Sequence, residues 1–488
     1  MTLPGVADPA NAGSRADPGG KAGAVERDAG SFRDPSGFIF WQDGQPYRQI
    51  QQRFAAEWDA FEASSLKRRL TEAGLLIPYE PVPIGRAQGP DAHAVIRPER
   101  IEFISYPYEW TFGELRDAAL LTLDAQLEAM AEGWQLKDAS AYNVQFRDAR
   151  PILIDSLSFE PLEEGAPWVA YRQFCEHFLA PLALIARRDV RLASLLRVDP
   201  DGIPLDLASS LLPWRTRLDF GLLSHVHLHA RAQRRYAGNE SEVEVDAARG
   251  ARISRQRLEG LIKNLRGTVE RLRWEPAGTE WSDYADHTSY GDAATADKSR
   301  LVEAFVNEAQ GSRLWDLGAN TGRYSRIAAD AGKRVIAFDI DPAAAERDYR
   351  QVRHEGRGDI LPLILDVANP SPGIGWAGRE RRSLLERADP DIVLALALVH
   401  HVAISRNVPL PMVLGLFADL ARYAIVEFVP KEDSQVRRLL ARRPDIFPDY
   451  AVAGFESAFA ARFALLRREE IPGTERTLYL MRRKKAVL

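Results

Sequence analysis

The chain has a single cysteine, Cys175, among 488 residues. It therefore cannot form an intramolecular disulfide or a cysteine-rich zinc site. No apolar run reaches the ~20 residues that a membrane-spanning helix needs, and the N-terminus has no basic segment followed by an apolar one. The net charge of −5 provides no general field that would attract nucleic acid or an anionic membrane. We therefore expect a cytoplasmic protein with no membrane as a partner and with no general affinity for nucleic acid, although a local patch could still serve a single-stranded RNA or a tRNA.

Large apolar residues are scarce in the first 35 residues, which are rich in Gly, Ala, Asp and Pro. Such a segment cannot bury enough surface to offset its chain entropy, so we predict that residues 1–35 are disordered. The chain as a whole has an ordinary globular composition, with 45% hydrophobic and 27% charged residues. Its length predicts two or three domains.

Strand and helix patterns are mixed between residues 36 and 245, which indicates an α+β domain. We predict, in chain order, a hairpin of residues 38–41 and 47–50 around Asp43-Gly44, strands at 94–96 and 101–105, and a helix at 114–130. A basic amphipathic helix at 248–273 could form a nucleic-acid surface, but such a pattern is more often the solvated charged face of a connecting helix.

After Leu301, short apolar strands alternate with helical stretches, which predicts an α/β domain with a mostly parallel, doubly wound sheet. The predicted strands are 313–317, 334–338, 360–365, 391–396 and 423–428, and a final hairpin of 463–470 and 476–481 through Pro472-Gly473. The hairpin should add two antiparallel strands to the edge of this sheet, giving seven.

The first of these strands runs into a glycine-containing turn, residues 318–322, and then into a helix. Gly318 and Gly322 would let the backbone pass close to a ligand. Asp316, at the strand end, is placed to accept from a cationic amine. A dinucleotide-binding loop would have Gly-x-Gly-x-x-Gly, whereas Asn320 stands here at the second glycine position, which disfavours a pyrophosphate.

The second and third strands also end in carboxylates. Asp339 is placed to accept the hydroxyl protons of a ribose, and Asp366 lies within reach of an adenine amino group. Three carboxylates thus end three successive strands, at the edge where open α/β sheets bind ligands.

The pattern Asp-x-Gly-x-x-x-Gly from Asp316 to Gly322 resembles the first motif of class I S-adenosylmethionine-dependent methyltransferases. Asp339 resembles their ribose-binding acid and Asp366 their adenine-contacting position. The terminal hairpin is also a mark of that Rossmann-like fold. The resemblance implies S-adenosyl-L-methionine as cofactor, bound by Asp316, Gly318, Asn320, Gly322, Asp339 and Asp366, and it implies no metal in this domain.

The fourth strand leads into His400 and His401, on the edge that faces the substrate in class I folds. A histidine there could deprotonate a hydroxyl or amine as the methyl group moves. His400 is our preferred general base, and a histidine bonded to nearby backbone is the alternative. Glu427, after the fifth strand, is a second candidate for the substrate site, and residues 429–450 could form a lid over it. Upstream, Trp281, Tyr284, Tyr290 and Lys298 are candidates for closing over the cofactor.

In the N-terminal region Asp138 and Asn143 lie five residues apart, and Asp155 follows an apolar strand. This arrangement resembles the catalytic loop and metal-binding aspartate of protein-kinase-like folds, where Asp138 would face an acceptor hydroxyl and Asn143 and Asp155 would hold magnesium. Several family features are missing: no Gly-x-Gly-x-x-Gly loop appears near residue 40, and Ser156-Leu157 stand where Phe-Gly is usual. The resemblance is therefore to a degenerate kinase-like module.

From about residue 38 to 488 the chain also resembles large bacterial proteins labelled methyltransferases, some related to host-specific nodulation proteins. We predict a disordered segment at 1–35, a kinase-like α+β domain at 36–245, a helical linker and cofactor-closing segment at 246–300, and a methyltransferase domain at 301–488. The expected activity is methyl transfer to a small-molecule or glycan-like acceptor. The alternatives are an N-terminal module that binds ATP and magnesium, or one that recruits a protein or RNA.

Overall fold

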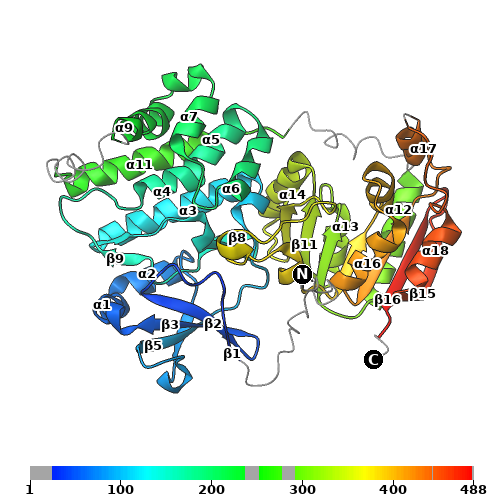
Figure 1. Ribbon diagram of the computed structural model, residues 1–488, viewed down its shortest axis with the longest axis horizontal. Helices are drawn as coiled ribbons and strands as arrows, with labels where there is room; N and C mark the ends of the chain where they lie inside the picture. Colours follow the sequence, from blue (N-terminus) through cyan, green and yellow to red (C-terminus); the bar gives the residue numbers. More distant parts are fainter. Residues whose placement is uncertain (1–24, 237–251, 277–291, 442, 486–488) are drawn as a thin grey trace, which may run out of the picture.

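The structure is a computed structural model that describes residues 25–236, 252–276, 292–441 and 443–485. Figure 1 shows two halves, with the N-terminal strands and most of the helices on the left and the larger, C-terminal sheet on the right. No helix among the described residues is long and apolar enough to cross a membrane.

The N-terminal half begins with a five-stranded antiparallel sheet in the order β1-β2-β3-β5-β4. Its strands are β1 Val25–Arg27, β2 Gly37–Gln42, β3 Gln45–Gln51, β4 Tyr79–Val82 and β5 Ala92–Pro98. The predicted hairpin is confirmed: β2 pairs with β3, and Asp43 and Gly44 both have positive φ, as a tight two-residue turn requires.

Two local predictions in this half are wrong. Residues 25–35 are part of the segment predicted to be disordered, yet β1 pairs with β2 and forms one edge of the sheet, and Asp28 accepts a hydrogen bond from the Trp41 indole over 2.9 Å. The sheet edge supplies backbone partners that composition cannot reveal, while residues 1–24 lie outside the described part of the chain. The predicted strand at 101–105 does not form, because Phe103 is instead drawn into the interface between the halves.

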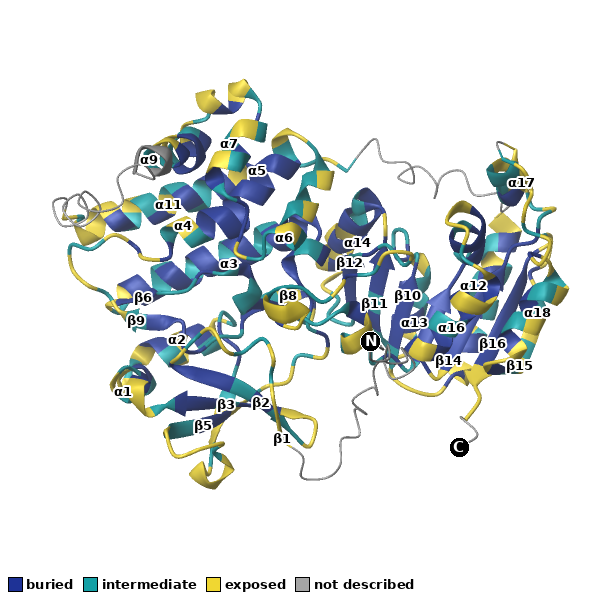
Figure 2. Cartoon of the chain, in the orientation of Figure 1, coloured by how far each residue is buried: buried dark blue, intermediate teal, exposed yellow. Residues whose placement is uncertain are grey.

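A helical layer follows the sheet, with the long α3 at its centre (Figure 2). Thr111 and Glu114 form a capping box at the start of α3. The helices are α1 Ala55–Ala63, α2 Ser65–Glu72, α3 Phe112–Ala131, α4 Tyr171–Phe174, α5 Ala180–Arg187, α6 Leu195–Val198, α7 Leu205–Leu211, α8 Phe220–Leu222, α9 His229–Tyr236 and α11 Arg255–Arg271. Two small antiparallel pairs complete it: β6 Trp134–Leu136 with β9 Phe159–Pro161, and β7 Val144–Arg147 with β8 Arg150–Leu153.

The division predicted between residues 246 and 300 differs from the structure. Helix α11 is part of the N-terminal helical layer, since Arg266 donates to Asp124 of α3 over 2.6 Å. Helix α12, Asp292–Glu308, packs on the C-terminal half, where its Val302 and Phe305 are buried beside β10 and β13 residues. The predicted linker thus contains two helices that belong to opposite halves.

The C-terminal half is a seven-stranded sheet in the order β12-β11-β10-β13-β14-β16-β15, parallel except for β16. Its strands are β10 Arg313–Leu317, β11 Arg334–Asp339, β12 Ile360–Ile364, β13 Ile392–Ala395, β14 Tyr423–Phe428, β15 Phe463–Glu470 and β16 Thr477–Arg483. Its other helices are α13 Arg323–Asp330, α14 Pro342–Glu355, α15 Leu384–Arg387, α16 Leu410–Leu420, α17 Ser434–Leu440 and α18 Val452–Ala460. The predicted doubly wound α/β sheet with a terminal hairpin is confirmed.

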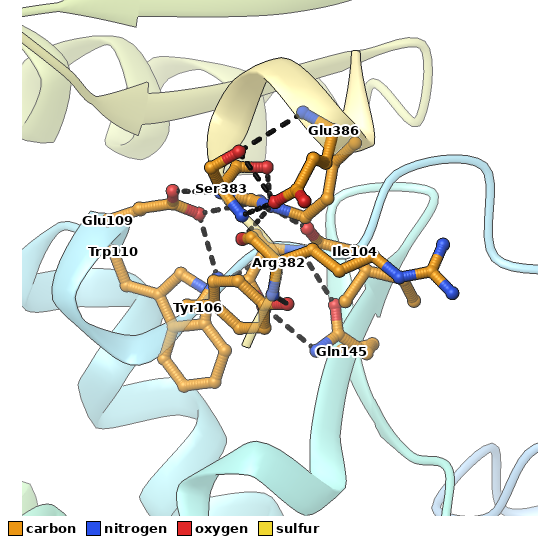
Figure 3. A network of polar contacts seen from close by, with 10 residues as sticks. Ile104, Tyr106, Glu109, Trp110, Gln145, Arg382, Ser383 and Glu386 are labelled. Atoms are coloured by element: carbon orange, nitrogen blue, oxygen red, sulfur yellow. Dashed lines mark hydrogen bonds and ion pairs between the residues drawn. The ribbon is translucent and has the colours of Figure 1, made fainter. Parts of the chain in front are cut away.

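The two halves meet through buried aromatic and polar contacts. Phe103 packs edge-on against Trp315 of β10 and Phe338 of β11, with ring centroids 5.5 and 6.1 Å apart. Figure 3 shows the adjoining polar network, in which the backbone N–H of Arg382 donates to the Tyr106 hydroxyl over 2.9 Å. Beside this network, the Arg387 guanidinium donates two hydrogen bonds to the Glu109 carboxylate, at 3.1 and 2.5 Å.

Replacing Arg387 with Met should destabilise the protein strongly. The Arg387 and Glu109 side chains are only 5% and 1% exposed, so the variant would leave a buried carboxylate without its partner. Breaking such a pair typically costs about 3–5 kcal/mol. Urea unfolding followed by tryptophan fluorescence should show a midpoint well below that of the wild type.

The double variant Glu109→Gln/Arg387→Met should recover part of this loss, because it removes the orphaned charge. Arg462→Gln, which breaks the exposed pair with Asp419, is the matched control and should leave the midpoint unchanged. A wild-type midpoint for Arg387→Met would contradict the account of the interface.

Candidate functional site

Three carboxylates meet at one edge of the C-terminal sheet. Asp316 lies near the end of β10, Asp339 ends β11, and Asp366 follows β12 by two residues. Because these strands are adjacent and parallel, their carboxyl ends share one edge. The structure therefore brings together the three acids that the sequence singled out.

The loop of residues 318–322 joins β10 to α13 across this edge. The backbone N–H groups of Gly318 and Ala319 donate to the Phe338 carbonyl over 2.8 and 2.9 Å. Gly318, Asn320 and Gly322 all have positive φ. The loop is thus pinned to β11 in a conformation that glycine and asparagine tolerate better than other residues.

The two glycines serve different purposes. A Cβ atom at Gly322 would collide with the Asp348 carboxylate of α14, which pairs with Arg326 at 2.7 Å. Gly322 is therefore needed by the packing of α13 on α14. At Gly318 a Cβ atom would lie 3.4 Å from the Leu398 side chain, which is ordinary contact distance. The positive φ, rather than the available space, is therefore what favours glycine at this position.

Asp339 and Asp316 are both buried carboxyl groups. Asp339 accepts from the backbone N–H groups of Asn320 at 2.7 Å and Asp341 at 2.8 Å, and burial raises its pKa to about 6. Asp316 accepts from the Ser325 hydroxyl over 2.7 Å, and burial raises its pKa to about 7. Each would gain from a ligand that stabilises its charged form.

Asp366 is more accessible than the other two acids. It accepts from the Ala368 backbone N–H at 2.9 Å and from the Arg406 guanidinium at 3.1 Å. It is half-buried, at the rim of the sheet edge.

A buried charge cluster, which we call the Glu427 cluster, lies at the neighbouring end of β14. Glu427 pairs with Lys298 of α12 at 2.6 Å and with Arg476 at 3.3 Å, and Arg476 also pairs with Asp433 at 2.7 Å. The Lys298 ammonium lies 4.7 Å from the centre of the Tyr324 ring. Arg476 and Asp433 are the site residues that the sequence analysis did not predict. Their ion pair forms only in the folded chain, and no local sequence pattern indicates it.

His400 and His401 follow β13, and their rings lie 4.0 Å apart between centroids with a tilt of 40°. His400 is fully buried, and neither of its ring nitrogens has a hydrogen-bond partner among the described residues. Burial lowers its pKa well below the usual value, and burial lowers that of His401 to about 4. Both rings are therefore neutral at neutral pH and have a lone pair that can accept a proton.

The remaining candidates of the C-terminal half are placed only in part. Trp281, Tyr284 and Tyr290 lie outside the described residues. Residues 429–450, considered as a lid, include α17, and the two ends of the segment are joined because the Tyr450 hydroxyl donates to the Val429 carbonyl over 2.8 Å.

The N-terminal residues Asp138, Asn143 and Asp155 also come together. Ser158 donates to Asp155 over 2.6 Å and accepts from the Asn143 amide at 3.2 Å. Burial, followed by the charge of Asp155, raises the pKa of Asp138. Asp155 forms a short ion pair with Arg48 of β3. Within the described ranges, no group of three or more His, Cys, Asp or Glu side chains is arranged to hold a metal ion.

Comparison with solved structures finds partial likenesses. Magnesium protoporphyrin IX methyltransferase (ChlM) from Synechocystis PCC 6803, with bound SAH, has a TM-score of 0.30 and 16% identity, covering 42% of this chain and 93% of that one. The N-methyltransferase NodS from Bradyrhizobium japonicum WM9 has a TM-score of 0.29 and 11% identity, covering 40% and 98%. No protein-family model matches the chain.

Similarity to a curated protein is far more extensive. The nodulation protein NoeA of Rhizobium meliloti (strain 1021) is 37% identical over 462 residues, which are 94% of this chain and 96% of that protein. The likeness thus spans both halves rather than the C-terminal sheet alone. With this identity along nearly its whole length, the chain belongs to the family of the nodulation protein NoeA.

Proposed function

We propose that this protein is an S-adenosylmethionine-dependent methyltransferase that acts on a small-molecule, glycan-like acceptor. One observation carries the proposal: Asp316, Asp339 and Asp366 stand at the ends of three adjacent parallel strands, on the ligand-binding edge of the sheet, where loop 318–322 is tied to Asp339. The order of the strands and the antiparallel β16 agree with the class I methyltransferase fold that the motif resembles.

The chemistry of these residues fits that cofactor. The buried Asp316 would be stabilised as a carboxylate by the ammonium of the methionine part. Asp339 uses two of its roughly four lone-pair sites for backbone N–H groups, which leaves room for ribose hydroxyls. Asp366 can accept from an adenine amino group beside Arg406. When bound, the cofactor supplies a methyl group already activated on a sulfonium.

The remaining task of the chain is to align an acceptor and take its proton. His400 is the candidate for this role because both of its ring nitrogens lack partners among the described residues, and a neutral imidazole has a lone pair that can accept a proton. Glu427 is less suited, since Lys298 and Arg476 neutralise it. We therefore assign Glu427 to holding the acceptor side of the site in place and His400, beside His401, to accepting the proton.

Calorimetric titration of the full chain with S-adenosylmethionine and S-adenosylhomocysteine tests the cofactor. We expect micromolar binding, about −8 kcal/mol. Asp339→Ala should weaken it at least tenfold by removing the ribose acceptor, and Gly318→Arg should abolish it by filling the loop. Asp419→Ala, an exposed carboxylate on the same half, is the control and should bind as the wild type does. A folded wild type that binds neither compound would overturn the proposal.

The pH dependence of binding tests the role of Asp316 separately. Because its pKa is about 7 in the free chain, Asp316 is mostly protonated at pH 6, and a cationic amine favours the carboxylate. Binding at pH 6 should therefore release close to one proton from this group, and its ionisation should raise the affinity about fivefold between pH 6 and pH 7. Calorimetry in buffers of different ionisation enthalpy measures the release.

Asp316→Asn should bind more weakly and release nearly one proton less at pH 6. The smaller release from Asp339, whose pKa is about 6, should persist in this variant and serves as the internal control. Unchanged proton release in Asp316→Asn would place the cofactor amine elsewhere.

A second candidate function is nucleotide binding by the N-terminal half, favoured by the convergence of Asp138, Asn143 and Asp155. The kinase-like resemblance assigns Asn143 and Asp155 to magnesium. ATP titration with magnesium should then give binding that Asp155→Ala abolishes and Asp59→Ala, an exposed carboxylate of α1, preserves. Absence of nucleotide binding by the folded wild type would dismiss this function and leave the methyltransferase proposal untouched.

A further inference from the structure

One end of the N-terminal helical layer exposes an unusual group of apolar side chains. Trp214, Leu218 and Phe220 are 67%, 78% and 71% exposed, and they lie within seven residues of one another. They belong to the short helix η8, Trp214–Leu218, and to the start of α8. Single exposed apolar residues are ordinary, but a local group of large ones marks an interaction surface.

The outward position of these side chains is fixed by what lies beneath them. Thr216 is buried and bonds to His227 at 2.9 Å. Asp219 caps α8 by accepting from Gly221 and Leu222. Gly221 packs so closely on Thr268 of α11 that a Cβ atom would collide with it. Trp214, Leu218 and Phe220 therefore cannot turn inward without unpacking this end of the layer.

Arginines surround the exposed apolar group. Arg215 and Arg217 alternate with it in η8, and both are exposed. Arg271 of α11 donates to Thr268, the residue that Gly221 contacts, which places Arg271 beside α8. In the described part of the chain, none of the three forms an ion pair with a carboxylate.

The positive surface continues into an open groove between α3 and α11. The groove has a volume of about 460 Å³ and is lined by Arg116, Leu120, Gly267, Glu270, Arg271 and Arg273. Arg116 lies 3.9 Å from the Asp117 carboxylate, and its Nε–H is buried without a hydrogen-bond partner among the described residues. Glu270 is already engaged by Arg266. Arg271 and Arg273 donate to a hydroxyl and to backbone carbonyls and pair with no carboxylate among the described residues, so they are the groove's guanidinium groups for an anion.

We propose that this surface, Trp214–Phe220 with Arg116 and Arg271, docks the protein on an anionic lipid bilayer. The three apolar side chains enter the boundary between headgroups and acyl chains, and the arginines bind headgroup phosphates and carboxylates. An exposed Trp beside Leu, Phe and Arg is the composition that such interfaces favour. RNA fits less well, because Leu218, the most exposed of the three, has no ring on which a base could stack.

From the net charge, we expected the protein to have no membrane as a partner, and the proposed surface differs from that expectation. A total charge of −5 says nothing about where the arginines gather. Helix α11 was predicted to carry an ordinary solvated basic face, and two of its cations do, since Lys263 pairs with Glu259 and Arg266 with Asp124 and Glu270. Arg271, at the end of α11 and beside α8, is the cation of this helix that lies next to the exposed apolar side chains. Lying on a bilayer needs no spanning helix.

Sedimentation of the full chain with vesicles tests the proposal. We expect binding to vesicles of phosphatidylcholine with phosphatidylserine, weakening as salt rises, and little binding to phosphatidylcholine alone. Trp214→Ser/Phe220→Ser should reduce the partition coefficient at least tenfold. Arg215→Gln/Arg271→Gln should reduce it about fivefold for each arginine. Met412→Ser, on the exposed face of α16, and Arg462→Gln are matched controls and should bind normally.

Three results would overturn it. The first is no sedimentation with anionic vesicles, and the second is sedimentation that both double variants retain. The third is tight binding of inositol hexakisphosphate or of a single-stranded RNA, lost in Arg215→Gln/Arg271→Gln, without any vesicle binding. That last result would assign the same arginines to a soluble polyanion. Unchanged thermal unfolding of the variants, expected for exposed positions, ensures that loss of binding reflects the surface itself.

Discussion

The candidate site depends on the hydrogen bonds that tie loop 318–320 to the end of β11. Two of them reach the Phe338 carbonyl and the third, from Asn320, reaches the Asp339 carboxylate. These bonds hold the turn after β10 against the end of β11, the neighbouring strand. Asp316 and Asp339 therefore lie on the same edge of the sheet. The positive φ at Gly318 and Asn320 is the backbone condition for this crossing. A ligand on this edge would therefore meet a loop that is already formed, with little ordering left to do on binding.

The two sides of the site differ in how their charges are balanced. At Asp316 and Asp339, burial outweighs the stabilisation that their hydrogen bonds provide, and both pKa values rise. At the Glu427 cluster, by contrast, Lys298 and Arg476 compensate Glu427 and Asp433. A cation is therefore favoured beside Asp316 and Asp339. A neutral group is favoured beside the Glu427 cluster, because an added charge would disturb its balanced network. This contrast agrees with a cationic cofactor amine and an uncharged hydroxyl-bearing acceptor.

Sequence patterns predicted the C-terminal sheet closely because its strands are short apolar runs between turn residues. The three acids were found for the same reason, since each marks the end of such a run. Arg476 and Asp433 could not be found, because their partnership forms only when β16 pairs with β14. The position of β1 and the loss of the 101–105 strand likewise depend on neighbours far away in the chain. Local pattern thus predicted elements and strand-end acids, whereas the ion pairs that close the site required the fold.

The N-terminal half packs against the strands that carry the candidate site. Phe103 covers Trp315 and Phe338, on the strands that carry two of the site acids. The Glu346 carboxylate of α14 accepts from the Gly113 N–H at the start of α3, over 2.7 Å, where the helix dipole favours a negative charge. The segment that follows β12 contains Asp366 and runs to the end of α15 at Arg387. The guanidinium of Arg387 pairs with the carboxylate of Glu109 in the N-terminal half. The N-terminal half therefore supports the strands and the connection that hold the three acids, and separating it would expose apolar surface directly behind them.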